Sequence, residues 1–324
     1  METAIGKTDK PGLKIFVCHT SGKINMQPKN PNYIHMIGGA ALCNDNIQDG
    51  LTGDNTGDNI SIKNRSYCEL TVQYWAWKNV DLDYYGFCHY RRFFSFNPPE
   101  NQVPDNFANV TFDFFEKKAL NQIIFEPEEV IAKMDASPIA MTTPFNVRNL
   151  DVSNVYEQYA TTEFLHKKDF DILLDVIHEF SPQFDEATRE CIKGHIVFPC
   201  NMFIMKKELF FRYCEWLFPV LQECERRIDF SNYDIDELRF IGHLGERCLG
   251  IFYSYLHKYE NINAVFFQRL LIVDKDNSTK VNNRAVNFGQ GIKLALKKII
   301  SPLFPTGSKG RIFFKKIYYQ FLKQ

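Results

Sequence analysis

The sequence predicts an α/β fold with a mostly parallel sheet flanked by helices. Short apolar runs of strand length recur at residues 13–18, 84–88, 138–142 and 196–206. Segments between them repeat apolar residues at helical spacing, most clearly after residue 61 and over residues 207–227. Because strands that alternate with helices build parallel units, we expect one domain over residues 1–285. Its ligand site should lie at the carboxyl ends of the strands.

The composition is that of an ordinary globular protein, with 324 residues, 45% of them hydrophobic and 24% charged. The net charge of −1 gives no overall field that would draw the chain to nucleic acid. Nine cysteines stand singly, which argues against a zinc site or a disulfide framework. No apolar run approaches the length of a membrane span. We therefore expect a cytoplasmic protein without a signal peptide.

The first half of the chain begins with the strand at residues 13–18. Residues 44–59 are rich in Gly, Asn and Asp and contain Gly-Asp-Asn twice, which predicts a long loop. The carboxylates of Asp54 and Asp58 could hold a ribose or a cation there, or they could simply make Asx turns.

A helix is expected to begin at Ser61 or Asn64. Its apolar face repeats at spacings of three and four, at Tyr67, Leu70, Tyr74 and Trp77. Glu69 falls off this stripe, in an early turn where a carboxylate complements the helix dipole. A helix N-terminus attracts anions, so the start of this helix is a candidate anion site.

Residues 83–94, DYYGFCHYRRFF, contain a predicted buried strand that ends abruptly in polar side chains. His89, Arg91 and Arg92 would face the crevice at the end of that strand. Arginine offers a planar fork of donors that suits phosphate or carboxylate, and histidine titrates near neutrality. The alternative is that the two arginines form surface ion pairs beside a half-buried histidine.

The second half of the chain continues the alternation. Helices are expected over residues 111–125 and 127–134, and two more within residues 151–180. Residues 196–206 are expected to form one strand, in which Pro199 marks an edge or bulge that would present Asn201 to a ligand. A helix follows over residues 207–227, and His243 and Glu246 lie near the start of another within residues 236–258.

Several blocks stand in order and close together: GDNIS-x-KN, CELT, YW-x-WKN and CHYRR. Later blocks are NMFIMK at residues 201–206, YCEW at residues 213–216, and Gly245-Glu246-Arg247. Together they resemble the signature of DUF4422, a bacterial family of capsule and O-antigen glycosyltransferases that is filed as a domain of unknown function. The resemblance spans residues 13–270 and implies a GT-A-like, Rossmann-type nucleotide-sugar transferase.

The resemblance also implies a set of site residues. Donor-binding residues are expected to be Asp58, Asn59, Lys63, Asn64, Glu69, His89, Arg91 and Arg92, with Asn201 and His243 toward the acceptor. Glu246 would be the base of an inverting displacement, because such enzymes need a carboxylate beside the acceptor hydroxyl. The alternative is that Glu246 pairs with Arg247, Arg239 or the helix dipole.

GT-A enzymes usually carry an Asp-x-Asp metal motif at the end of a buried strand, where this chain has His89-Tyr90-Arg91. The Asp-x-Asp pairs at residues 81/83, 169/171 and 234/236 precede a strand or lie at expected helix starts. We therefore expect no metal site and favour an enzyme with no required cofactor. Arg91 and Arg92 would take the place of the metal charge on the diphosphate. A requirement for Mn²⁺ or Mg²⁺ is the alternative.

Residues 286–324 differ from the rest of the chain. From Lys293 onward, basic residues alternate with apolar ones and no Asp or Glu occurs. This pattern predicts a basic amphipathic helical extension that binds an anionic membrane surface, at the inner face of the bacterial plasma membrane. The alternative is a helix that packs on the domain.

These expectations favour transfer of a hexose from a nucleotide sugar to a lipid-linked oligosaccharide, in the synthesis of capsule, O-antigen or another surface polysaccharide. The resemblance suggests galactose, in pyranose or furanose form. Two other classes stay open. One is a phosphate-handling hydrolase or phosphotransferase that uses His89 and the arginines, and the other is a non-catalytic sugar-binding or scaffold protein of the same pathway.

Overall fold

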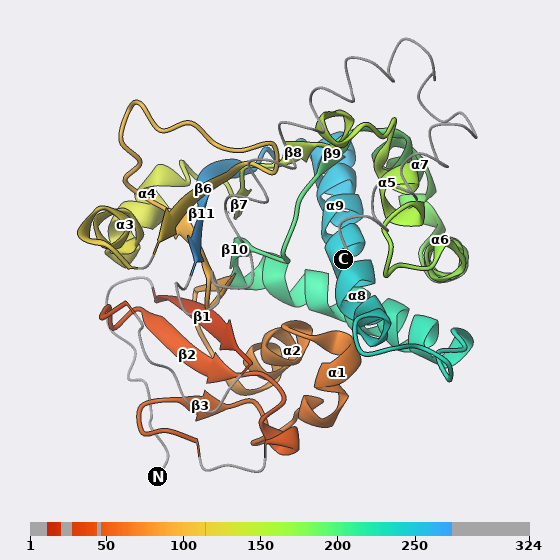
Figure 1. Ribbon diagram of the computed structural model, residues 1–324, viewed down its shortest axis with the longest axis horizontal. Helices are drawn as coiled ribbons and strands as arrows, with labels where there is room; N and C mark the ends of the chain where they lie inside the picture. The colour runs from red at the N-terminus through yellow and green to blue at the C-terminus, as the bar shows by residue number, and fades with distance from the viewer. Residues whose placement is uncertain (1–11, 21–27, 44–46, 114, 274–324) are drawn as a thin grey trace, which may run out of the picture.

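The computed structural model describes residues 12–20, 28–43, 47–113 and 115–273. These residues form a mixed α/β structure with helices packed against one large sheet (Figure 1). The expected basic extension at residues 286–324, and the boundary at residue 285, lie outside this part of the chain. No helix of the described residues is long and apolar enough to cross a membrane.

The large sheet is parallel on one side and mixed on the other. Its strands within the described residues are β1 (Leu13–His19), β2 (Tyr33–Ile37), β3 (Thr52–Gly53), β4 (Tyr84–His89), β5 (Arg92–Ser95), β6 (Asn109–Asp113), β7 (Ile139–Thr142), β10 (Phe203–Lys206) and β11 (Val265–Val273). Neighbours in the order β3-β2-β1-β4 run parallel, as expected. Strand β10 runs antiparallel between β4 and β7, and β5 runs antiparallel to β4 and β11. Strands β8 (Phe145–Asn146) and β9 (Ile196–Val197) pair separately.

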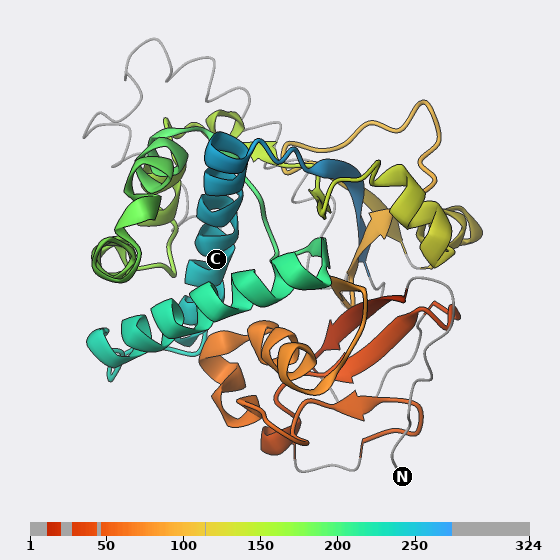
Figure 2. The same ribbon diagram turned by 180° about the vertical axis from the view of Figure 1, so that it is seen from behind.

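The helices of the described residues are α1 (Asn64–Tyr67), α2 (Leu70–Asn79), α3 (Lys117–Ile123), α4 (Pro127–Lys133), α5 (Val155–Ala160), α6 (Lys167–Phe180), α7 (Asp185–Lys193), α8 (Lys207–Arg227) and α9 (Phe240–Glu260). Helix α8 buries the predicted stripe that includes Phe210, Tyr213 and Leu217. It contacts β4, β10, α2 and α9, and Figure 2 shows it crossing α9. One hydrophobic cluster therefore lies between α8 and the sheet, and a second one packs α3 and α4 against the sheet.

Two expected elements are interrupted by residues with positive φ. The helix that starts near residue 61 breaks between α1 and α2, because Cys68 has φ 50° and ψ −129°. The strand expected over residues 196–206 splits into β9 and β10, because Cys200 and Asn201 have φ of 72° and 46° and turn the chain. The first break is at neither glycine nor proline, so composition does not signal it. The second contains Pro199, where the sequence predicts an edge or bulge.

The helix expected over residues 111–125 begins later than predicted. Residues 111–113 belong to β6, which pairs in parallel with β11 and places Thr111 opposite Leu271. Long-range pairing overrides the local pattern here, and only residues 117–123 are helical. The two helices expected within residues 151–180 are present as α5 and α6, with the predicted break near His166.

Two glycines of α9 let this helix lie directly against the corner between α1 and α2. A Cβ atom at Gly242 would lie 3.1 Å from Cys68 Sγ, and one at Gly245 would lie 2.8 Å from Leu70 Cδ1. The glycines are three residues apart and so share one face of the helix. This close approach brings Cys68 and Glu69 beside the first turns of α9.

Candidate active site

A pocket of about 610 Å³ opens where β1 and β4 end. Its lining residues come from the end of β1, the α1–α2 corner, the β4–β5 turn and the segment before α9: Cys18, His19, Thr20, Asn64, Arg65, Cys68, Glu69, His89, Tyr90, Arg91, Arg92, Ile235, Leu238 and Arg239. Five residues expected at the donor site therefore meet in one place: Asn64, Glu69, His89, Arg91 and Arg92. The site lies at carboxyl strand ends, as the sequence predicts.

The pocket is strongly cationic. Arg65, Arg91, Arg92 and Arg239 line it, against a single lining carboxylate, that of Glu69. The arginine ion pairs between described residues involve other arginines, Arg212, Arg226 and Arg227. The guanidinium of Arg91 lies 4.9 Å from the centre of the Tyr90 ring, and its Nε is buried without a partner among the described residues. These unpaired cations suit a ligand with several negative charges.

His19 adds a polar group without adding charge. Its Nε2 lies 2.9 Å from Nδ1 of His35, and both rings are buried. Burial, together with the neighbouring His35, lowers the pKa of His19 to about 3. Burial also lowers the pKa of His35. The pair is therefore neutral at physiological pH.

The turn at Cys200 and Asn201 joins three of the expected site residues. The carbonyl oxygen of Cys200 lies 2.6 Å from Nε2 of His89, and the N–H of Cys200 donates to Oε1 of Glu246 at 3.0 Å. The side-chain amide of Asn201 donates to Oε1 of Glu69 at 2.7 Å. Asn201 is only 1% exposed, so the turn contacts the carboxylates of Glu69 and Glu246 from the interior of the protein.

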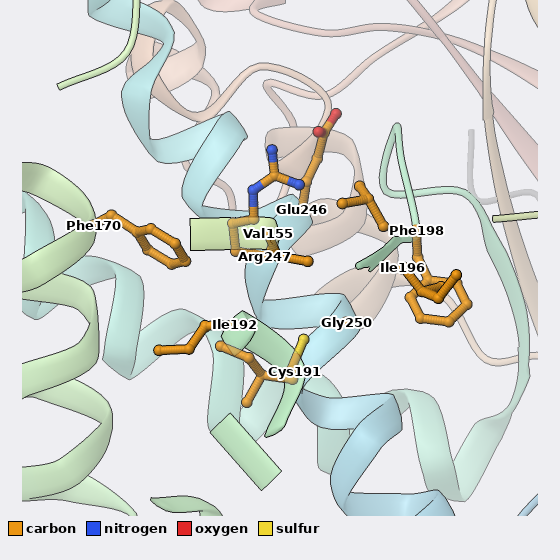
Figure 3. Close-up of a pocket in the computed structure, with 11 residues that line it drawn as sticks. Val155, Phe170, Cys191, Ile192, Ile196, Phe198, Glu246, Arg247 and Gly250 are labelled. Atoms are coloured by element: carbon orange, nitrogen blue, oxygen red, sulfur yellow. The ribbon is translucent and has the colours of Figure 1, made fainter. Parts of the chain in front are cut away.

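Glu246 also borders a small cavity of about 10 Å³, which is lined mainly by apolar side chains. Figure 3 shows the Glu246 carboxylate pointing away from Cys191 and Ile192 at the far side of that cavity. A space of this size holds about one water molecule and no substrate. Arg247 donates to Gln158 at 2.7 Å, and the described residues show no ion pair between Arg247 and Glu246. Among the described residues, the N–H of Cys200 is the one hydrogen-bond donor to the Glu246 carboxylate.

His243 lies on the same helix, one turn before Glu246. Its ring centre lies 5.4 Å from that of Phe164, and its Nε2 is buried without a partner among the described residues. Burial lowers the pKa of His243, although Glu246 acts in the opposite direction. A neutral imidazole beside a carboxylate can exchange hydrogen bonds with a hydroxyl.

Three expected donor-binding residues do not line the pocket. Asp58 is exposed and accepts a hydrogen bond from the Tyr74 hydroxyl at 3.1 Å. Asn59 bonds within its own turn, and Lys63 forms an ion pair with Glu225 at 2.6 Å. They lie in the segment that leads into α1, just before the pocket residue Asn64.

Asp54 has a structural role. Its buried carboxylate accepts the N–H groups of Gly39 and Ala40 at 2.9 Å and the hydroxyl of Ser61. Gly39 has φ 72°, so this turn favours glycine, and Asp54 fixes it to the start of the first 3-10 turn. Of the two readings of Asp54, the turn-forming one fits the structure.

The described residues contain no group of three or more His, Cys, Asp or Glu that could hold a metal ion. The Asp-x-Asp pairs have structural partners: Gly12 and Lys207 for residues 81/83, Tyr233 and Lys167 for 169/171, and backbone N–H groups for Asp234. The pairs 81/83 and 234/236 precede β4 and the 3-10 turn before α9, and the pair 169/171 lies in the first turns of α6, which confirms the placement that the sequence predicts.

The sequence prediction missed two pocket arginines, Arg65 and Arg239. Arg239 ends a 3-10 turn before α9 and lies beside Cys68, whose thiol pKa burial raises to about 12 while Arg239 acts to lower it. A residue distant in the sequence holds this turn in place, because Nε2 of His166 lies within hydrogen-bond distance of Oε1 of Glu237, at 3.0 Å. Arg65 directly follows the Lys-Asn of the first block, which is the one local signal that could have found it.

Comparisons with known proteins agree with this geometry. The sequence model of the family described as "Domain of unknown function (DUF4422)" matches residues 14–259. The fold is similar to a solved structure described as "WbbM bifunctional glycosytransferase apo structure", with a TM-score of 0.75 and 29% sequence identity. The match covers 81% of this chain and 46% of that chain, so this chain corresponds to less than half of WbbM. No match was found among curated proteins.

Proposed function

Because the chain belongs to the DUF4422 family, we propose that it is a glycosyltransferase that moves a hexose from a nucleotide sugar to a glycan acceptor. The observation that carries this proposal is the pocket at the ends of β1 and β4, where four arginines meet that form no ion pair with any described residue. A volume of about 610 Å³ is in the range of small-molecule sites. The similar structure of WbbM, named as a glycosyltransferase, supports the same activity.

Arg91 and Arg92 hold the diphosphate of the donor in this proposal, and Arg65 and Arg239 line the same pocket. When the bond to the sugar breaks, negative charge grows on the leaving nucleoside diphosphate, and preorganised cations stabilise that charge. The same cations do the electrostatic work that a bound metal ion would do, so turnover needs no divalent cation. His89 and Asn64 complete this end of the pocket, whereas Lys63, Asp58 and Asn59, which do not line it, are left out of the proposed site.

The transfer itself is an inverting displacement. The oxygen of an acceptor hydroxyl forms a bond to the anomeric carbon, and the bond from that carbon to the diphosphate oxygen breaks with its electron pair. The hydroxyl proton passes to Glu246, which the N–H of Cys200 orients through one oxygen. His243 and Asn201 lie on the acceptor side. We infer a lipid-linked oligosaccharide acceptor, galactose as the sugar, and contact with an anionic membrane through residues 286–324.

Calorimetric titration with UDP and UDP-galactose, first with EDTA and then with Mn²⁺, tests the proposal. Binding should survive EDTA and weaken at least about tenfold in Arg91→Ala and in Arg92→Ala, because a charged hydrogen bond is lost. Arg212→Ala is the matched control, since Arg212 pairs with Glu260 outside the pocket. Binding that requires Mn²⁺ would reject the metal-free site, and no binding of any nucleotide would reject the transferase.

A further inference from the structure

Glu69 is the one carboxylate among the residues that line the arginine-rich pocket. A carboxylate repels a diphosphate, so it disfavours the ligand that the arginines attract. No ion pair joins it to any of the four pocket arginines among the described residues. Charge compensation by direct pairing therefore does not explain its position, and a neutral ligand group that donates a hydrogen bond would suit this carboxylate better than a diphosphate would.

The backbone places Glu69 at some cost. The preceding residue, Cys68, has φ 50° and ψ −129°, a conformation that residues with a side chain rarely adopt. The carbonyl of Cys68 is held there by the side chains of Asn64 at 2.7 Å and Thr71 at 3.1 Å. Strain that the surroundings hold in place gathers at functional sites. This corner also carries the glycine-mediated contact with α9, through Gly242.

Asn201 fixes one oxygen of the Glu69 carboxylate and leaves the other free. Its amide donates to Oε1 of Glu69 at 2.7 Å and lies 3.3 Å from the carbonyl of Gly242. The backbone carbonyl oxygen of Asn201 accepts a hydrogen bond from the side-chain amide of Gln73 at 3.2 Å. Oε2 of Glu69 has no hydrogen-bond partner among the described residues, and neither does the buried Oδ1 of Asn201. Oε2 of Glu69, a residue that lines the cationic pocket, is thus an acceptor without a partner among the described residues.

We propose that Glu69 binds hydroxyl groups of the transferred sugar and that Asn201 positions Glu69 for this contact. The inference rests on the proposed function and deepens it. The arginines bind the charged half of a nucleotide sugar, and Glu69 binds its neutral half through acceptors that only a donor group such as a hydroxyl can satisfy. The site thereby distinguishes the intact donor from the nucleoside diphosphate that leaves it.

The test compares the affinity of UDP with that of UDP-galactose, UDP-glucose and UDP-N-acetylglucosamine in wild-type protein and in Glu69→Gln. At least one UDP-sugar should bind about tenfold more weakly to the variant, because a hydrogen bond to a charged group is lost. UDP itself should bind equally well or better. Glu260→Gln, a surface change outside the pocket, should alter neither affinity. Equal effects on UDP and on every UDP-sugar would overturn the proposal.

Two further measurements keep the test independent of one variant. Deoxy analogues of the preferred UDP-sugar should bind wild-type protein more weakly at the hydroxyl that Glu69 contacts, and Glu69→Gln should be insensitive to removal of that hydroxyl. Asn201→Ala should reproduce the selective loss, and the double variant should lose little more, as expected for one coupled unit. Undiminished binding of every deoxy analogue overturns the contact, and additive losses overturn the positioning role. If wild-type protein binds no nucleotide, the proposed function itself fails.

Discussion

His89 Nε2 lies 2.6 Å from the carbonyl oxygen of Cys200, the residue whose own N–H donates to Glu246 at 3.0 Å. Because a carbonyl only accepts, His89 is the donor in this contact, and Nε2 carries the proton. One peptide group therefore links the end of β4 to the first turns of α9. Through this link, the turn at Cys200 contacts both His89, which we propose binds the donor, and Glu246, the proposed base.

The conformation of Cys200 predicts how that turn tolerates substitution. At φ 72°, a β-branched residue clashes with its own backbone, so Cys200→Val should lower the free energy of unfolding by about 2 kcal/mol or more. Cys200→Gly should stay within about 1 kcal/mol of wild type, because glycine adopts this φ freely. Urea unfolding measures both. Equal losses in the two variants would show that thiol packing, and not backbone strain, dominates at this position.

The aspartates of the two Gly-Asp-Asn sequences, Asp54 and Asp58, are expected to contribute very differently to the stability of the fold. Asp54→Ala leaves the N–H groups of Gly39 and Ala40 without their buried acceptor, so stability should fall by about 3 kcal/mol or more. Asp58→Ala removes an exposed contact with Tyr74 and should cost less than about 1 kcal/mol. Thermal unfolding of the pair provides the comparison. A large loss in Asp58→Ala would assign that residue a structural role that its exposure does not suggest.

The sequence could predict the elements that depend on local periodicity, such as β1, β4 and α8, and the gathering of His89, Arg91 and Arg92 at a strand end. It could not predict the positive φ of Cys68 and Cys200, because both are non-glycine residues whose surroundings include α9, although Pro199 does indicate a bulge beside Cys200. The segment that carries Arg239 into the pocket is held by contacts of Glu237 and Tyr233 with His166 and Asp169, which are distant in the sequence. Tertiary contacts, which a single sequence does not reveal, decide these positions.

Asp169, in α6, accepts a hydrogen bond from Tyr233 in the segment before α9. Burial raises the pKa of the Asp169 carboxyl, and the hydrogen bond from the Tyr233 hydroxyl acts to lower it. The folded state holds the Asp169 proton to a higher pH than the unfolded state, so stability falls as pH rises through this pKa. Asp169→Asn keeps an acceptor for Tyr233 without the charge, so at pH 7 it should be as stable as wild type or up to about 1 kcal/mol more stable. Chemical denaturation at pH 7 and pH 4 should show this difference shrinking in acid. A variant that is clearly less stable at pH 7 would contradict the prediction.

The His19–His35 pair predicts sensitivity to acid with the opposite sign. The folded-state pKa of His19, about 3, lies below the 6.5 of an unperturbed histidine. Between these values the unfolded state binds the extra proton, so stability is lost as pH falls, by at most about 1.4 kcal/mol per pH unit for each such group. His19→Gln, which keeps a donor for His35, should unfold with a shallower pH dependence between pH 6 and pH 4. NMR of the imidazole signals should find His19 neutral at pH 5, and a midpoint near 6.5 would show that its burial does not govern its protonation.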